Sequence, residues 1–354
     1  MTDTTIANST KSTAAAAATP ATATMLWLHA LTPVHVGAGR GAGVIDLPIV
    51  REAVTHLPYL PSSEIKGVLA ASSFASADFR ESPLPLNDAD KTRQQQLARY
   101  AFGTRHEAAE GGGALVFCDA RLVCFPARSL YGTFTWLACG LTLQRLKQDL
   151  EVFLEATGIP AVPNVTGDNI MLAATSSVLA LPDQKTAFVE DLDFAVTLAT
   201  PDTDFCKWAD FISANWFVDD PAWEASFKSR FALISDEAFG FLTDTACEVR
   251  ARVRLKEQSK TVIAGQLWYE EYLPQEALLA APVWCDGIST TTAGEIAKLL
   301  DNATEDRPAQ VRANLLAHYC KDQSLRLGGK QSVGKGQCQA RFAQPQVRLE
   351  APKV

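Results

Sequence analysis

The sequence predicts an α+β fold. Segments with the alternating or continuous apolar residues of strands are mixed with amphipathic helical segments and do not alternate strictly with them. The chain has 354 residues, of which 47% are hydrophobic and 20% are charged, which is ordinary for a globular protein. We expect a single domain over residues 25–345, without internal repeats.

The N-terminal half begins with a tail. Residues 1–24 consist mainly of Ala, Thr and Ser, a composition that predicts disorder. Ser62 or Ser63 is the expected N-cap of the first helix, because serine side chains accept hydrogen bonds from free amides there. The elements predicted in this half are a strand over residues 25–36, a glycine-rich loop over 37–43, helices over 64–74, 89–101 and 140–155, and a β segment over 114–124.

The C-terminal half contains one segment without a recognisable period. Residues 158–228 are rich in Pro, Asp and aromatic residues, and we expect an irregular insertion there. The alternating pattern over residues 246–272 predicts a β-hairpin that turns near Gln258-Ser259-Lys260. The other predicted elements are a strand over 231–235, helices over 236–242, 293–301 and 307–319, and a tail over 346–354.

The overall composition excludes several classes of protein. The net charge is -8, which argues against indiscriminate binding of nucleic acid through a uniformly positive surface but allows local basic tracks. None of the eight cysteines forms a C-x-x-C pair, so the common zinc spacings are absent and we expect thiols in a reducing cytoplasm. No apolar run approaches eighteen residues, and the first 24 residues lack the features of a signal peptide. We therefore expect a cytoplasmic protein that does not cross a membrane.

The predicted hairpin carries a row of cations. Arg250, Arg252, Arg254 and Lys256 occupy every second position, and apolar residues fill the positions between them. A period of two places the cations on one face of the strand, at a spacing that suits a phosphate backbone. A solvated edge strand explains the same pattern, because charges also protect sheet edges from aggregation.

A second basic feature is the glycine-rich run over residues 328–336, which reads GGKQSVGKG. Glycine permits positive φ and close approach, so successive backbone amides can cradle a phosphate while lysines supply charge. We predict that this loop binds the backbone of a polynucleotide. The residues involved would be Gly328, Gly329, Lys330, Gly334, Lys335 and Gly336.

Two other interpretations of this run remain. Residues 329–335 match G-x-x-x-x-G-K, the core of a nucleotide-binding loop. However, Gly336 stands where that motif needs Ser or Thr, and the following residues alternate like a strand instead of opening a helix. A simple glycine turn between two strands is the other alternative.

Acidic residues offer candidates for chemistry. Asp46 lies between Ile45 and Leu47, an apolar frame that would hold its carboxylate stiffly. Such a carboxylate can bind a divalent metal or accept a proton from a 2′-hydroxyl, although a turn or capping aspartate looks the same in sequence. Alternation places Glu270 and Tyr272 on one face of the hairpin, where proton transfer and a solvated strand end are both open.

These features occur together in one known family. The segments TPVHVG (32–37), GVIDLPIVRE (43–52) and LPYLPSSEIKG (57–67), followed by the terminal glycine loop, resemble the RAMP superfamily of CRISPR proteins. VIDLPIVRE, GALVFCDARLVCFPARSL (113–130) and LWYEEYLP (267–274) are similar to the backbone subunit of type III-B (Cmr) effectors, with the type III-A backbone subunit as the closest rival. The resemblance covers residues 25–342.

The resemblance implies a fold and an assembly. The family fold is a modified ferredoxin-like (RRM-like) palm with inserted fingers and a thumb β-hairpin, and residues 246–272 would be the thumb or its base. Copies of the subunit would stack in a filament along a CRISPR guide RNA, together with the other Cmr effector subunits. The complex would cleave complementary target RNA at regular intervals through attack by a 2′-hydroxyl, or the chain would be a non-catalytic scaffold.

The resemblance also assigns roles to residues. Asp46 matches a catalytic aspartate that uses a divalent metal, Mg²⁺ or Mn²⁺, and Glu270 and Tyr272 match further catalytic positions. His35, Arg51 and Lys66 would contact RNA, together with Arg250, Arg252 and Arg254 of the hairpin and the glycine loop. Two positions depart from the family pattern, namely Ala70 in place of an arginine and Glu64 in a helix expected to face RNA.

Overall fold

A 12-stranded mixed sheet runs through the molecule in the computed structural model, which describes residues 22–41, 43–78, 88–103, 112–174, 177–300 and 307–346. Its strand order is β13-β14-β1-β12-β4-β5-β9-β6-β8-β7, with β2 paired to β4 and β3 paired to β12. The strands are β1 (Ala23–Ala30), β2 (Tyr59–Leu60), β3 (Leu115–Phe117), β4 (Ala120–Arg128), β5 (Phe134–Cys139), β6 (Asn169–Ala173), β7 (Thr186–Val189), β8 (Leu192–Ala199), β9 (Phe231–Ile234), β12 (Leu278–Cys285), β13 (Gln323–Arg326) and β14 (Gln337–Ala343).

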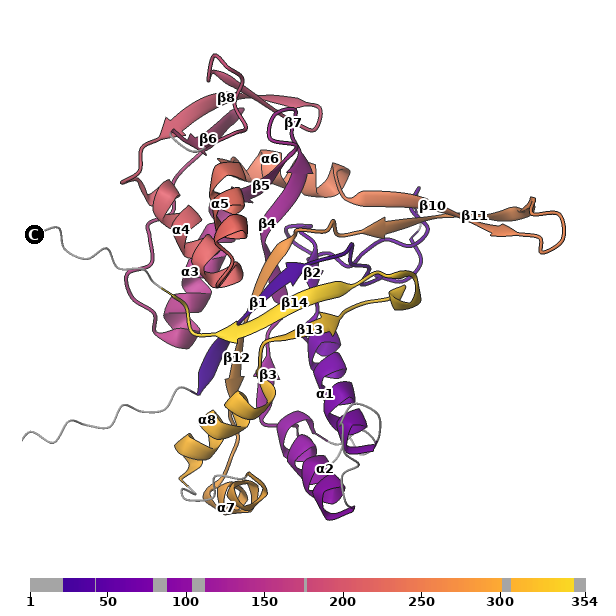
Figure 1. Ribbon diagram of the computed structural model, residues 1–354, viewed down its shortest axis with the longest axis vertical. Helices are drawn as coiled ribbons and strands as arrows, with labels where there is room; N and C mark the ends of the chain where they lie inside the picture. The colour runs from indigo at the N-terminus through magenta and orange to yellow at the C-terminus, as the bar shows by residue number, and fades with distance from the viewer. Residues whose placement is uncertain are drawn as a thin grey trace, which may run out of the picture.

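Helices cover both faces of this sheet (Figure 1). They are α1 (Ser62–Asp78), α2 (Asp88–Phe102), α3 (Gly140–Leu154), α4 (Asp204–Trp216), α5 (Pro221–Arg230), α6 (Asp236–Thr245), α7 (Thr290–Leu299) and α8 (Pro308–Tyr319). α3 and α4 contact β1, whereas α1 packs with α2, and α2 packs with α7. The fold is α+β, as the sequence predicts. Among the described residues, no helix is long and apolar enough to cross a membrane.

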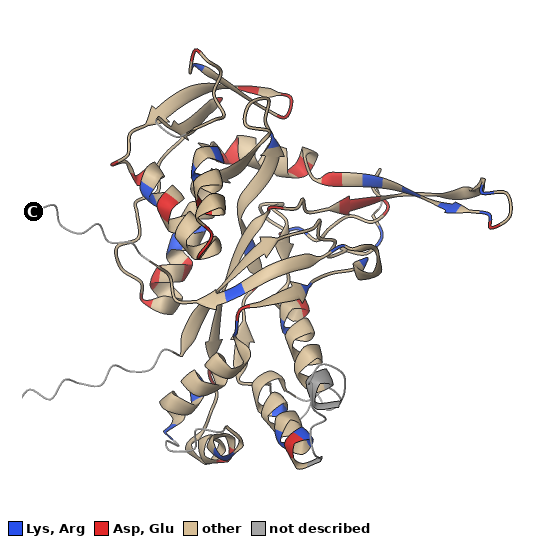
Figure 2. Cartoon of the chain, viewed as in Figure 1, with Lys and Arg blue, Asp and Glu red and all other residues tan. Residues whose placement is uncertain are grey.

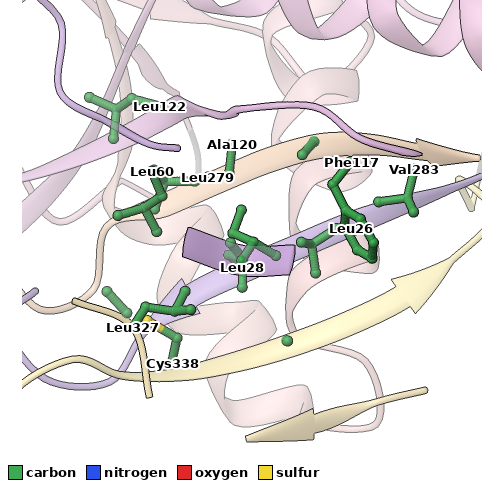
Figure 3. Packing of buried hydrophobic residues seen from close by; sticks show 14 of the residues in the cluster. Leu26, Leu28, Leu60, Phe117, Ala120, Leu122, Leu279, Val283, Leu327 and Cys338 are labelled. Carbon is green, nitrogen blue, oxygen red and sulfur yellow. The ribbon is translucent and has the colours of Figure 1, made fainter. Parts of the chain in front are cut away.

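β1 lies at the centre of the hydrophobic core. It pairs antiparallel with β12 on one side and with β14 on the other. Leu26 and Leu28 point into one core layer, where Figure 3 shows them beside residues of β2, β3 and β12. Met25 and Trp27 point into the second layer, against α4. Both faces of the strand are therefore buried, which explains its continuous apolar run.

The segment 158–228, for which the sequence predicted an irregular insertion, contains regular elements joined by loops. It forms β6, β7, β8, α4 and α5, and β6 joins the main sheet by pairing antiparallel with β9. The sequence shows no clear amphipathic period over α4, because this helix is buried on most of its circumference. One Asp-Pro pair of the segment begins a helix: Asp220 accepts a hydrogen bond from the Trp223 amide, and Pro221 occupies the first turn of α5.

The predicted hairpin is confirmed as β10 (Glu248–Leu255) and β11 (Val262–Tyr272), a separate two-stranded sheet that projects from the body (Figure 1). Figure 2 shows basic residues along its length. Its alternate apolar face is also exposed, since Val249, Val253 and Leu255 keep 45–48% of their surface. This hairpin contains a long sheet face of apolar residues that nothing in the described chain covers.

The first strand ends earlier than predicted, at Ala30 and not at residue 36. Pro33 has no amide proton to continue the ladder. The chain continues as a loop held by isolated bridges, among them Val34 to Leu273 and Leu47 to Glu270. The loop therefore lies along the root of the hairpin. The predicted tails over 1–24 and 346–354 fall almost wholly outside the described residues.

Candidate nucleic-acid interface

Three segments that are distant in sequence meet at the root of the hairpin. These are the loop over residues 31–51, the ends of β10 and β11 nearest the body, and the glycine loop between β13 and β14. Backbone hydrogen bonds join them: the Gly329 amide donates to the His35 carbonyl at 2.8 Å, and the Leu47 amide donates to the Tyr269 carbonyl at 3.0 Å.

Glu270 organises this junction. Its side chain is 2% exposed and accepts from Lys330 Nζ at 2.5 Å, Arg252 Nε at 3.2 Å and Trp268 Nε1 at 2.8 Å. It also accepts from the Tyr272 hydroxyl. Burial raises the pKa of Glu270, but these hydrogen bonds outweigh it and lower the pKa to about 2. The expectation of a solvated strand end is wrong, because the carboxylate is buried and fully hydrogen-bonded.

Two further cations, Arg250 and Lys335, lie near the Glu270 carboxylate. Lys335 Nζ lies 5.1 Å from the centre of the Tyr272 ring, a cation–π geometry, and Lys335 is only 8% exposed. Burial lowers the pKa of Lys335, and the nearby charges of Arg250 and Arg252 lower it further. Together, Arg250, Arg252, Lys330 and Lys335 form what we call the basic cluster.

The basic cluster has a surplus of positive charge. Its four cations face two carboxylates, Glu270 and Glu248, the latter paired with Arg250. Surplus cations at the root of a projecting hairpin attract a polyanion. Arg254 lies farther out on the exposed part of β10, at an irregularity in the pairing with β11 between Val253 and Leu255.

The amides of Gly328, Gly329, Gly334 and Gly336 have partners within the chain, so the prediction that these four glycines cradle a phosphate remains without support. All four donate within the protein, to Glu64 Oε1 and to the carbonyls of His35, Gln331 and Pro33, respectively. The Lys335 amide donates to the Lys330 carbonyl. The loop therefore contributes its lysine side chains to the basic cluster, while its backbone is occupied.

The glycines are nevertheless required by the backbone. At Gly328, φ is +79°, and a Cβ atom would lie 2.3 Å from the His35 carbonyl oxygen. At Gly336, φ is +80°, and a Cβ atom would lie 2.0 Å from the Leu327 oxygen. Only glycine satisfies both conditions. The loop is a turn between two strands, and because it leads into β14 and not into a helix, the nucleotide-loop interpretation fails.

Asp46 lies beside the basic cluster with its side chain exposed to solvent. Its Oδ2 accepts a hydrogen bond from the Tyr269 amide at 2.8 Å, which fixes the carboxylate against β11. Within the described residues, no group of three or more His, Cys, Asp or Glu side chains could hold a metal. One carboxylate fits Mg²⁺ only where substrate phosphates and water complete the coordination.

Three other residues predicted to contact RNA make hydrogen bonds within the protein. His35 is 6% exposed, and its Nδ1 lies 2.7 Å from the Glu271 carbonyl oxygen. Arg51 has a side chain 9% exposed, with both terminal nitrogens bonded to protein. Lys66 Nζ donates to the Leu115 carbonyl at 2.9 Å, and burial lowers its pKa. The structure gives these side chains partners within the chain, so their predicted RNA contacts remain without support.

Two carboxylates at this site have roles that sequence reasoning missed. Glu64, noted as a departure from the family pattern, accepts the Gly328 amide at 2.7 Å and ties α1 to the glycine loop. Glu271 is 4% exposed and faces away from Glu270. Adjacent residues of a strand point to opposite faces, so the sequence already indicated that Glu270 and Glu271 have different surroundings.

A model of the RAMP superfamily matches residues 27–339. The chain belongs to the RAMP superfamily. Within this superfamily it is a distant homologue of Cmr4, the backbone subunit of type III-B complexes. It is 27% identical over 312 residues to the CRISPR system Cmr endoribonuclease Cmr4 of Pyrococcus furiosus, a match that covers 88% of this chain and 92% of the relative. It is 23% identical over 334 residues to the CMR subunit Cmr4 of Saccharolobus solfataricus, covering 89% and 95%.

Solved structures of this RAMP branch share the fold. Oligomeric Cmr4 from Pyrococcus furiosus superposes with a TM-score of 0.63 at 19% identity, covering 92% of this chain and 99% of that one. A chain of the type III-B Cmr-beta complex bound to cognate target RNA gives 0.61 at 17% identity, covering 92% and 98%. The mixed sheet with a projecting hairpin is thus the fold of this family.

Proposed function

We propose that the protein is the backbone subunit of a type III-B RNA-guided effector, which binds guide RNA and cleaves complementary target RNA at regular intervals. The observation that carries this proposal is the basic cluster at the root of the hairpin, with the exposed Asp46 carboxylate fixed beside it. The relatives named as a Cmr endoribonuclease and as part of a target-bound complex support it.

The elements divide naturally for this task. We assign the central strands around β1 to a ferredoxin-like palm, the α1–α2 and α7–α8 region to fingers, and the β10–β11 hairpin to the thumb. Further copies of the chain would stack along the guide RNA beside other Cmr subunits. The guide reads sequence by base pairing, so an acidic protein needs only local basic tracks.

The proposed mechanism depends on geometry and charge. The thumb unstacks bases locally, and this frees the target backbone to place a 2′-hydroxyl in line with its phosphate. The basic cluster stabilises the negative charge that develops on the phosphate. The products would be a 2′,3′-cyclic phosphate and a 5′-hydroxyl.

Asp46 is the residue we propose to act on the RNA itself. Its fixed carboxylate would receive the proton of the 2′-hydroxyl or hold a divalent metal. Asp46 is the residue that would hold a Mg²⁺ or Mn²⁺ ion, and such an ion would supply additional positive charge near the scissile group.

Glu270 and Tyr272 have a supporting part in this proposal. A carboxylate with a pKa of about 2 remains ionised at neutral pH and is a weak base. Glu270 instead holds Lys330 and Arg252 in place, and Tyr272 donates to Glu270 and packs against Lys335. We therefore propose that both residues contribute by positioning cations.

The test compares Asp46→Ala with wild type in complexes assembled with guide RNA and partner subunits. Labelled target RNA and Mg²⁺ should give evenly spaced cuts with wild type and none with Asp46→Ala, while target binding is equal. Asp183→Ala is the matched control, since Asp183 is another exposed aspartate that accepts a backbone amide, from Lys185. The control should cut normally.

A non-catalytic scaffold is the second candidate. The hydrogen bond from the Tyr269 amide to Asp46 favours it, because this contact by itself gives the aspartate a structural purpose. A scaffold predicts that Asp46→Ala loses assembly or guide binding and not cleavage alone. Binding without cleavage in both wild type and variant would place the nuclease in another subunit.

A further inference from the structure

Glu271 is a buried carboxylate for which the proposed mechanism has no use. It follows Glu270 in sequence but lies on the opposite face of β11, and its side chain is 5% exposed. A buried charge persists only where it is paired and hydrogen-bonded, so its partners indicate its role.

Both side-chain oxygens of Glu271 bind the segment that follows Asp46. Oε2 accepts from the Ile49 amide at 3.0 Å, and Oε1 lies 2.6 Å from Arg51 Nη2. These contacts lie three and five residues after Asp46. One carboxylate therefore holds the exit of the loop at two points.

The backbone of Glu271 binds the same loop twice more. Its amide donates to the Leu47 carbonyl at 3.0 Å, directly after Asp46. Its carbonyl oxygen lies 2.7 Å from His35 Nδ1, and because a carbonyl can only accept, this histidine nitrogen carries the proton. Glu271 therefore holds the loop on both sides of Asp46.

Arg51 extends the connection to the other strand of the hairpin. Nη2 donates to the Thr243 carbonyl at 3.1 Å and to Cys247 Sγ at 3.4 Å, and Nη1 donates to Asp244 at 3.1 Å. These three residues form the joint between α6 and β10. The Arg51–Glu271 pair therefore joins both roots of the hairpin to the loop that carries Asp46.

We infer that Glu271 is a positioning residue that couples the hairpin to Asp46, an inference that rests on the proposed function of Asp46. A displacement of the hairpin root is transmitted through Glu271 to Leu47, Ile49 and Arg51. Asp46 itself accepts from Tyr269, two residues before Glu271 on β11. A hairpin seated on RNA thereby sets the orientation of the Asp46 carboxylate.

Three variants test this coupling. Glu271→Gln keeps the size of the side chain and removes its charge. Arg51→Lys keeps the charge and removes the guanidinium fork, so it is the milder second variant. Glu276→Gln is the matched control, because Glu276 is also a mostly buried carboxylate with a side-chain partner, His29 at 2.6 Å, but belongs to a different junction.

Two readouts separate positioning from general destabilisation. At saturating target RNA, Glu271→Gln should lower the cleavage rate by about 10- to 100-fold, the range expected for a displacement near 1 Å, with the half-saturating target concentration unchanged. In the isolated subunit, hydrogen exchange should increase over residues 44–52 and remain unchanged over β1. Arg51→Lys should lie between Glu271→Gln and wild type, and Glu276→Gln should match wild type.

Wild-type cleavage and wild-type exchange in Glu271→Gln would overturn the inference. If Glu271→Gln fails to fold, the same two readouts on Arg51→Lys decide: wild-type cleavage and wild-type exchange in that variant would overturn the inference. If the wild-type complex itself does not cut RNA, the proposed function fails, but faster exchange over residues 44–52 would still support the coupling of the loop to the hairpin.

Discussion

Glu270 illustrates how one residue can hold several cations at an interface. Its carboxylate accepts hydrogen bonds from Lys330, Arg252, Trp268 and Tyr272. Without it, Lys330 and Arg252 would lose their carboxylate partner beside the other cations of the basic cluster. A buried acid is therefore compatible with a surface that binds a polyanion.

The depressed pKa of Glu270 predicts a pH-dependent stability. The folded-state pKa is about 2 and the ordinary value is 4.5, so ionised Glu270 stabilises the fold above pH 4.5, and this stabilisation is lost as pH falls toward 2. The shift corresponds to about 3 kcal/mol. Urea unfolding should show Glu270→Gln less stable than wild type at pH 7, with the gap narrowing below pH 4.5. A gap that is constant with pH would contradict the prediction.

Gly328 allows a second test at this scale, with Gly334 as its control. Both residues have positive φ, +79° and +77°, but a Cβ atom at Gly328 meets the His35 backbone whereas one at Gly334 meets open space. Gly334→Ala should cost only the conformational penalty of about 1–2 kcal/mol. Gly328→Ala should cost clearly more in urea unfolding. Equal costs would show that the His35 contact relaxes without effect.

At the scale of elements, the β10–β11 hairpin separates two kinds of surface. One face carries the arginine row, and the other carries exposed apolar side chains. The arginine row gives this element a measurable electrostatic signature, because each phosphate contact releases counterions.

Arg254→Ala should weaken RNA binding by the assembled complex and lower the slope of log affinity against log salt by about one. Arg128→Ala is the control. Arg128, at the end of β4, is also an exposed arginine, but it pairs with Glu190 and lies away from the hairpin. Binding titrations at several salt concentrations measure the affinity and its salt dependence for both variants. An unchanged slope in Arg254→Ala would mean that the outer part of β10 does not touch phosphate.

The sequence predicted the hairpin and the basic row because strand alternation is a local property. It also singled out Asp46 and the lysines of the glycine loop, which the structure brings to the root of the hairpin and whose roles stay predictions. It did not reveal that the loop amides are occupied, since their partners Glu64, His35 and Pro33 lie hundreds of residues away. The order within 158–228 was hidden for a similar reason: its strands and α4 are stabilised by burial against distant elements.

At the scale of the whole molecule, charge is divided between regions. Residues 158–228 contain 11 acidic and 3 basic residues, a net charge of -8, which equals that of the entire chain. The remaining residues balance at 29 of each sign. Under the proposed function, RNA would be repelled from the region formed by residues 158–228 and attracted to the hairpin root, which would orient the molecule on it.

The body should be independent of the outer hairpin. Nearly all residues over 254–266 are exposed. Replacing them with an Asn-Gly turn should leave the free energy of unfolding within about 0.5 kcal/mol of wild type. The same variant should lose target cleavage, because the unstacking element is shortened. A large loss of stability would indicate that the outer hairpin packs on the body.

The uncovered apolar face of the hairpin also has a consequence for how the protein is made. A newly synthesised chain presents Val249, Val253 and Leu255 to water. Such a strand pair is an aggregation hazard at high expression. Under the proposed function, the yield of soluble chain should therefore follow the supply of its proposed assembly partners, and chain made in excess should aggregate.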